Sequence, residues 1–231
     1  MPETSENSIA HTKNCIVLED SKCEICELDG ELVCKVDKKE ANKFLIGNIL
    51  YRVTAITIFV LSGLLIGHWW MIGTYTGIVL FTFLLLEPWL LCSHCPFYEK
   101  EGKVLKCWAL RGMPKIRKYQ LGPMKTYEKI LMLIFGTYID LFPFVGIIWG
   151  IVKFAKEPAA NLYLGIEIVS VSVVFLVLVY YFGQILLGNK CKKCTNFSCP
   201  MNKVQEEKIN QFLDKNPKMK EAWLEAGWKK E

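Results

Sequence analysis

The sequence predicts an all-α integral membrane protein with four transmembrane helices arranged as two antiparallel hairpins. Of its 231 residues, 52% are hydrophobic and only 22% are charged, which excludes an intrinsically disordered chain. The apolar residues form long uncharged runs in the middle of the chain, whereas charged residues and ten cysteines collect at the two ends and in one central loop. This segregation is typical of a membrane protein.

A helix that crosses the hydrocarbon core needs about 20 apolar residues. Four stretches meet this length: residues 44–67, 69–91, 130–152 and 162–188. Almost no chain separates the first two, and a short turn around Pro158 separates the last two, so each pair is expected to form a hairpin. The predicted units are an N-terminal tail (1–43), a first hairpin (44–91), a basic loop (92–129), a second hairpin (130–188) and a C-terminal tail (189–231).

The distribution of positive charge predicts the orientation. The central loop contains nine basic residues: Lys100, Lys103, Lys106, Arg111, Lys115, Arg117, Lys118, Lys125 and Lys129. The opposite side has only Lys153 and Lys156. Because cytoplasmic loops carry the excess of lysine and arginine, we expect a multi-pass protein of the cell membrane with both termini in the cytoplasm. The first forty residues are polar and do not form a signal peptide, so all ten thiols are expected to be reduced.

The first cysteine group consists of Cys15, Cys23, Cys26 and Cys34. Its Cys-x-x-Cys pair, Cys23 and Cys26, presents two thiolates to one metal ion. The dipeptide Asp29-Gly30 predicts a tight turn that returns Cys34 to the same place, and Cys15 supplies a fourth ligand. We therefore expect the N-terminal tail to be zinc-ribbon-like and to bind one zinc ion on its own, because it contains too few apolar residues to fold unaided.

The second group is Cys92, Cys95 and Cys107, and the third is Cys191, Cys194 and Cys199. Each begins with a Cys-x-x-Cys pair directly after a predicted span, which suggests a faint two-fold repeat of a hairpin with a cysteine knuckle. Three thiolates leave a zinc or iron–sulfur site one ligand short. Either His94 completes the second group, or the two groups pool their six thiolates, or one site keeps an open position.

Pooling would tie the two hairpins together, because neighbouring helices in a bundle lie about 8–10 Å apart. Small metal-binding knuckles on the cytoplasmic side complete the predicted fold class. The basic residues around the second group are also expected to lower the pKa of its thiols, although the positive-inside rule alone explains most of these lysines.

Four charged residues, Arg52, Glu87, Asp140 and Glu167, fall inside the spans, where ionised groups are paired or functional by default. Counting residues from the cytoplasmic ends puts Arg52 and Glu87 at similar depths, so we expect an ion pair between them. Asp140 and Glu167 have no obvious cation. They are expected to bond Tyr138 or Ser170, or alternatively to line an ion path.

The C-terminal tail is charged and helix-prone, with a break at Asn216-Pro217. Asn216 is a suitable N-cap with Pro217 at the first helical position, and Gly227 is a suitable stop. Met219 and Trp223 fall on one face of this helix, which is expected to lie on the bilayer or on the central loop.

The leading functional hypothesis is a membrane protein whose cytoplasmic thiolates bind metal, acting as an accessory or electron-transfer subunit of a membrane complex. Zinc is expected in the first group, and zinc or an iron–sulfur cluster in the second and third. The alternatives are a thiol-disulfide or quinone-linked oxidoreductase and a metal transporter or sensor. The expected partners are the lipid bilayer and other membrane subunits, and no nucleic-acid motif accompanies the basic residues.

The predicted topology can be tested by labelling single engineered cysteines in a background that retains folding. Position 156 is expected to react with an impermeant reagent from outside, while positions 103 and 229 are protected, because the central loop carries the excess of positive charge. The reverse pattern would refute the orientation and, with it, the reducing environment of the thiols.

Overall fold

The computed structural model describes residues 13–17, 26–159 and 161–229. Within these ranges the protein is helical, with isolated β-bridges in place of strands. The helices in chain order are α2 (Lys38–Ile66), α3 (Trp70–Phe81), η2 (Thr82–Leu91), η3 (Cys92–His94), η4 (Pro96–Glu99), α4 (Thr126–Lys156), α5 (Leu162–Gly183), η5 (Gln184–Lys190), α6 (Glu206–Asp214) and α7 (Pro217–Glu225).

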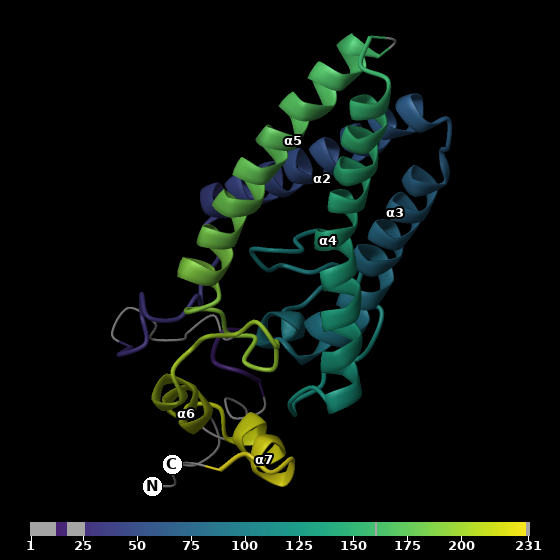
Figure 1. Cartoon of the computed structure of the whole chain (residues 1–231). Coiled ribbons are helices and arrows are strands. Elements are labelled where there is room, and N and C mark those ends of the chain that lie inside the picture. Colours follow the sequence, from purple (N-terminus) through teal and green to yellow (C-terminus); the bar gives the residue numbers. More distant parts are fainter. Residues whose placement is uncertain (1–12, 18–25, 160, 230–231) are drawn as a thin grey trace, which may run out of the picture.

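Four continuous helical segments are long and apolar enough to cross a membrane, as the sequence predicts. They are Lys38–Ile66, Trp70–His94, Thr126–Lys156 and Leu162–Lys190. Figure 1 shows α4 and α5 meeting at the end opposite to α6 and α7, with α2 behind them. Helix α2 packs against both α4 and α5. Helix α4 continues through Pro143.

The second and fourth segments end in the same way. The α-helix α3 passes into the π-helix η2, and α5 passes into the π-helix η5. At each end a cysteine N–H bonds to the carbonyl five residues earlier, Cys92 to Glu87 and Cys191 to Leu186. In η2 this wider turn accommodates Pro88, which lacks an N–H. The two Cys-x-x-Cys pairs thus follow equivalent helix endings, as expected for a repeat.

Small residues allow the helices to approach closely. Gly146 and Gly150 lie one turn apart on α4, and Ser62 of α2 donates a hydrogen bond of 2.7 Å to the Gly146 carbonyl. A Cβ atom at Gly146 would lie 2.9 Å from the Phe59 ring, and one at Gly150 would clash with Ile168 of α5. This small-residue stripe is how helices associate in lipid, where apolar burial supplies little attraction.

The described parts of the two tails and the central loop, residues 13–17, 26–37, 95–125 and 191–229, gather near the end of η2, the start of α4 and the end of η5, and we call them the head (Figure 1). Three parts of the sequence contribute to one apolar core of the head. Its buried members are Ile16, Leu28, Leu32, Phe97, Phe197, Val204, Ile209, Phe212, Leu213, Met219 and Trp223. The two tails and the central loop therefore fold together.

Helix α7 has the predicted ends, with Asn216 as the N-cap residue, Pro217 as its first residue and Gly227 at φ +92° just beyond it. Met219 and Trp223 are buried in the head core. The helix also approaches the central loop, because a Cβ at Gly122 would contact the backbone of α7. Of the two expected settings, the structure therefore places α7 on the central loop.

Substituting Gly150 by alanine should weaken the bundle, because the added methyl group would clash with Ile168 and meet the Ser62 hydroxyl at 3.0 Å. Overpacking of this kind costs about 1–3 kcal/mol of unfolding free energy. Gly136→Ala in the same helix is the matched control, because nothing lies within 4 Å of its Cβ position. Thermal unfolding in detergent measures the difference; equal stability of the two variants would contradict the contact.

Candidate functional site

The three predicted cysteine groups are all found in the head or at its border with the membrane helices. Nine of the ten cysteines lie in the described ranges. Cys23, a predicted zinc ligand, lies outside the described residues. Cys15, Cys26, Cys34, Cys95 and Cys107 pack against the head core. The core that closes the head therefore also positions members of two cysteine groups.

The second and third groups are brought together. The sulfur of Cys95 lies within electrostatic range of those of Cys107, Cys194 and Cys199. A direct hydrogen bond supports this proximity, because Asn196 Nδ2 donates to the carbonyl of Leu91 at 3.0 Å. Leu91 immediately precedes Cys92, and Asn196 lies between Cys194 and Cys199 in the sequence.

One of these thiols accepts a backbone hydrogen bond, because the N–H of Leu110 lies 3.2 Å from the sulfur of Cys107. The N–H groups of Phe97, Asn196 and Met201 act electrostatically on Cys95, Cys194 and Cys199, respectively, and favour their thiolate forms. Cys191 has no such donor among its electrostatic partners in the described residues. Amide donors are a feature of cysteines that bind metal as thiolates.

Burial determines the pKa values of the head thiols. It raises the pKa of Cys194 to about 12 and that of Cys199 to about 11, while the amide donors act in the opposite direction. Burial also raises the pKa of Cys95 and Cys107. The expectation that nearby lysines lower these values is therefore wrong. Desolvation outweighs them, and Cys191 is the described thiol on which a lysine, Lys203, clearly acts.

The N-terminal group is attached to the rest of the head. The N–H of Cys15 donates to Asn216 Oδ1 at 2.7 Å, and Asn14 donates to Glu99 in η4. Val33 N–H bonds the carbonyl of Lys193, between the cysteines of the third group. The predicted turn is present, with the Asp29 N–H bonded to the Cys26 carbonyl and Gly30 at φ +75°.

No three Cys, His, Asp or Glu side chains in the described ranges are arranged so that they could hold a metal ion. Metal binding by any of the ten cysteines therefore stays a prediction. What the structure contributes is the proximity of the second and third groups, their burial and their amide donors.

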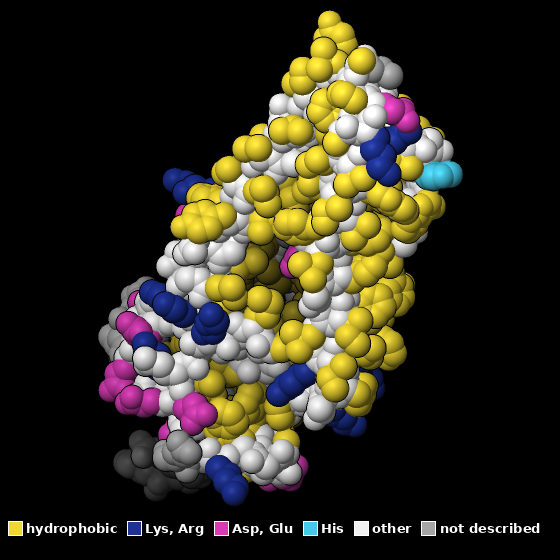
Figure 2. Space-filling view, in the orientation of Figure 1, with side chains coloured by type: hydrophobic (Ala, Val, Ile, Leu, Met, Phe, Trp, Pro, Cys, Tyr) yellow, Lys and Arg dark blue, Asp and Glu magenta, His cyan; other side chains and the backbone are white. Residues whose placement is uncertain are grey.

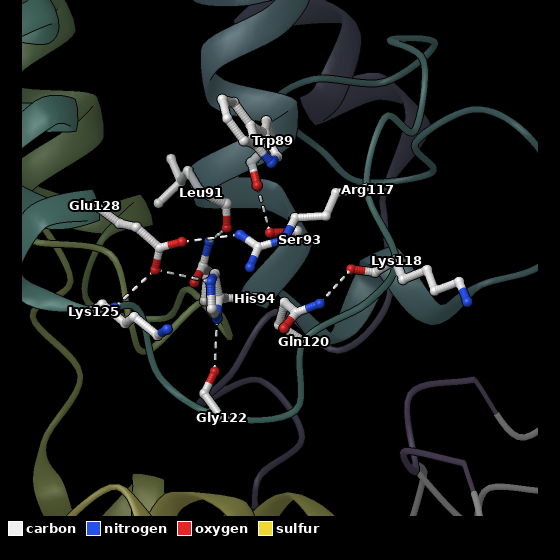
Figure 3. A network of polar contacts seen from close by, with 11 residues as sticks. Trp89, Leu91, Ser93, His94, Arg117, Lys118, Gln120, Gly122, Lys125 and Glu128 are labelled. Atoms are coloured by element: carbon white, nitrogen blue, oxygen red, sulfur yellow. Dashed lines mark hydrogen bonds and ion pairs between the residues drawn. The ribbon is translucent and has the colours of Figure 1, made fainter.

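His94 belongs to a different network, shown in Figure 3. Its Nδ1 lies 2.7 Å from the Gly122 carbonyl, and its Nε2 lies 3.3 Å from Glu128 Oε2, without hydrogen-bond geometry. Glu128 also accepts from Arg117 at 2.9 Å and from the Lys125 N–H at 2.8 Å. Both ring nitrogens face these partners, so His94 is a poor fourth ligand for the second group.

This network joins the Cys92–Cys95 segment to the start of α4, and it was not predicted from the sequence. Glu128 is 1% exposed at the first turn of α4, an unusual burial for a carboxylate. Its position three residues after Lys125 is the spacing at which an acidic side chain bonds the N-cap N–H. That spacing was the available signal, but neither Arg117 nor His94 is close to Glu128 in the sequence.

The predicted ion pair between Arg52 and Glu87 is wrong. Arg52 instead pairs with Asp140, with its Nη1 3.7 Å from Asp140 Oδ1. Depth counting failed because it ignores which helix lies alongside: α2 packs against α4 over much of its length, and this brings Asp140 to Arg52. Asp140 is bonded by Tyr51, not by Tyr138. Ser170 bonds the carbonyl of Ile166 in its own helix.

The four long apolar helices support a multi-pass membrane protein with contact to the lipid bilayer. No protein family, curated protein or solved structure was found to match this chain. The function therefore has to be argued from the head and the membrane segments themselves.

Replacing Glu128 by glutamine should loosen the central loop, because it removes the charge that holds Arg117 while keeping the side-chain shape. A buried hydrogen bond to a charged partner is worth about 1.5–3 kcal/mol, so local opening should become easier by about this amount. Hydrogen–deuterium exchange of residues 117–128 measures the change. Glu101→Gln is the control, because its ion pair with Lys13 is exposed and should contribute under about 1 kcal/mol. Identical exchange in both variants would contradict a structural role for Glu128.

Proposed function

We propose that this chain is a membrane-embedded metal–thiolate protein with its head in the cytoplasm, serving as an accessory or electron-transfer subunit of a membrane complex. One observation carries the proposal: the partly buried thiols Cys95, Cys107, Cys194 and Cys199 come from two cysteine groups that lie within electrostatic range of one another, and a backbone N–H acts on each of these sulfurs. We call these four residues the thiol cluster.

The arrangement favours a bound cation over free thiols. Backbone N–H groups stabilise a sulfur that carries negative charge, whereas they stabilise a neutral thiol only weakly. Their presence near four sulfurs therefore favours thiolates. Burial, in contrast, opposes ionisation of a thiol that has no cation beside it. A zinc ion or an iron–sulfur cluster reconciles the two effects, because the metal deprotonates its ligands and neutralises their charge.

The number of ligands also supports pooling. Each group supplies two members of the thiol cluster, and four thiolates complete a structural zinc site or a four-cysteine iron–sulfur site. Cys92 and Cys191 lie beside the cluster, and in this proposal they do not bind its metal. His94 is not needed as a ligand.

A second zinc site is proposed for Cys15, Cys23, Cys26 and Cys34. The turn at Asp29-Gly30 supports the proposed return of Cys34. Because Leu28 and Leu32 belong to the shared head core, we propose that this zinc stabilises the head as a whole and not an independent tail.

The alternative functions are less well supported. A thiol-disulfide enzyme needs accessible thiolates of low pKa, whereas burial raises the pKa of the head thiols. A metal-ion path through Asp140 would bring the cation next to the positive charge of Arg52. Glu167, the other expected path residue, is exposed on α5.

The proposal is tested by metal and sulfide analysis of the full-length protein purified without oxygen. Cys107→Ser and Cys199→Ser are each expected to remove the metal of the thiol cluster. The double variant should lose little more than either single one, because ligands of one site act as a unit. Iron with sulfide and visible absorbance would identify an iron–sulfur cluster, and colourless protein with zinc would identify a zinc site.

Cys191→Ser is the matched control, because this thiol lies next to the cluster but lacks an amide donor among its described partners. It should retain most of the metal. Cys34→Ser should remove a separate zinc equivalent and leave the cluster metal in place. Strictly additive losses from Cys107→Ser and Cys199→Ser would indicate two separate sites. Unchanged metal content in both, or metal-free wild-type protein, would overturn the proposal.

A further inference from the structure

A polar cluster lies inside the membrane part of the protein, where three helices meet. Arg52 of α2 donates to the Tyr75 hydroxyl of α3 at 3.3 Å and lies 3.7 Å from Asp140 of α4. Tyr51 donates to the same Asp140 oxygen at 3.3 Å. The guanidinium carbon of Arg52 lies 4.7 Å from the Tyr51 ring centre and 5.1 Å from that of Phe83. We call Tyr51, Arg52, Tyr75 and Asp140 the Arg52 cluster.

The cluster is closed on one side and open on the other. Tyr75 is fully buried, and the Arg52 side chain is 18% exposed, whereas the Asp140 side chain is 64% exposed. Asp140 lies near the middle of α4, where the surroundings are hydrocarbon. An ionisable group open to hydrocarbon is costly and marks a functional site by default. Its open side therefore requires either water or a ligand.

Figure 2 shows a hollow in the apolar surface between α5 and α4, with an acidic side chain at its margin. The hollow is surrounded by hydrophobic side chains and lies above the head. Aromatic rings are packed behind the Arg52 cluster, with Tyr51 stacked on Phe175 at 5.2 Å and near Phe182 at 5.9 Å. The same region thus combines charge, hydrogen-bonding groups and flat apolar surfaces.

Arg52 retains capacity to bind a further acceptor. Its Nε is buried and has no hydrogen-bond partner among the described residues, and its Nη1 holds both of its polar contacts at 3.3 Å or more. The carboxylate of Asp140 can accept a proton donor on its open side. Arg52 carries a positive charge and Asp140 a negative charge, so the cluster favours neither a bare cation nor a bare anion as its ligand.

We propose that the Arg52 cluster binds the head of a neutral, membrane-dissolved aromatic molecule with ring oxygens, of the quinone–quinol class. A ring oxygen of either form accepts from Arg52, and in the quinol form a hydroxyl group donates to Asp140. The aromatic side chains contact the ring faces, and the apolar tail remains in lipid. A hydrated ion offers no apolar surface, and a phospholipid headgroup lies at the interface and not at the depth of Asp140.

Glu87 connects this cluster with the thiols. This partly exposed residue of η2 lies within electrostatic range of Arg52 and Asp140 on one side. It also lies within range of Cys92, Cys107 and Cys199 on the other. Glu87 is therefore within electrostatic range of both the proposed ligand site and the proposed metal site. The ligand site does not depend on a metal being present, because its contacts come from the membrane helices.

The test uses the full-length protein in lipid nanodiscs, with a decyl-benzoquinone and its quinol as the probes. Binding is followed by quenching of tyrosine and tryptophan fluorescence, with decylbenzene, which has no ring oxygens, as the reference. Saturable binding of one probe molecule per chain is expected, with no saturable binding of decylbenzene. Arg52→Lys should weaken binding of the quinone about tenfold, and Asp140→Asn should weaken binding of the quinol about tenfold, each through the loss of one charged hydrogen bond.

Glu167→Gln is the control, because it changes another intramembrane carboxylate outside the Arg52 cluster and should bind the probe like the wild type. Circular dichroism and thermal unfolding show whether each variant is folded. If Arg52→Lys unfolds, the test rests on Asp140→Asn, which changes an exposed position. Absence of saturable binding, or unchanged affinity for the quinol in folded Asp140→Asn, would overturn the proposal. Metal content is measured in the same samples, so that loss of quinone binding with metal retained, or the reverse, shows which of the two proposals fails.

Discussion

The shared apolar core of the head is the constraint on which the extramembrane structure depends. None of the three contributing segments has enough apolar residues to bury a core alone. In such a segment, apolar burial does not offset the conformational entropy that is lost when the segment becomes ordered. Phe97 from the central loop, Leu32 from the N-terminal tail and Phe197 from the C-terminal tail bury one another's surface. Because the cysteines are a few residues from these anchors in each segment, the same packing that closes the head determines where the thiols lie.

The membrane part is held together by different physics. Lipid competes for apolar contacts, so the close approach of α2 and α4 depends on Gly146, Gly150 and the Ser62 hydrogen bond. This approach also sets the pairing of Arg52 with Asp140. An ion pair in the membrane is thus a consequence of helix packing, and the small residues that permit the packing are as important to it as the charges.

The parts of the structure that depend on local sequence could be predicted. Hydropathy located the four long helices, and Asn216, Pro217 and Gly227 located the ends of α7. The parts that depend on which elements meet could not. The ion-pair partner of Arg52 was predicted wrongly. The effect of lysine charge on the thiol pKa was also overestimated relative to that of burial. The meeting of the second and third cysteine groups was reached by counting ligands, because a missing fourth ligand is visible in the sequence even though spatial proximity is not.

The π-helical endings η2 and η5 explain why the two Cys-x-x-Cys pairs enter the head alike. In both, the N–H of the first cysteine closes the widened turn, so this residue, Cys92 or Cys191, still belongs to the helix end. The second cysteine, Cys95 or Cys194, comes one turn later, where the chain has left the helix and its sulfur can receive a following N–H. A π-turn adds one residue to a helical turn and so rotates everything after it relative to the helix. The same rotation at two helix ends directs the second cysteine of each pair into the head.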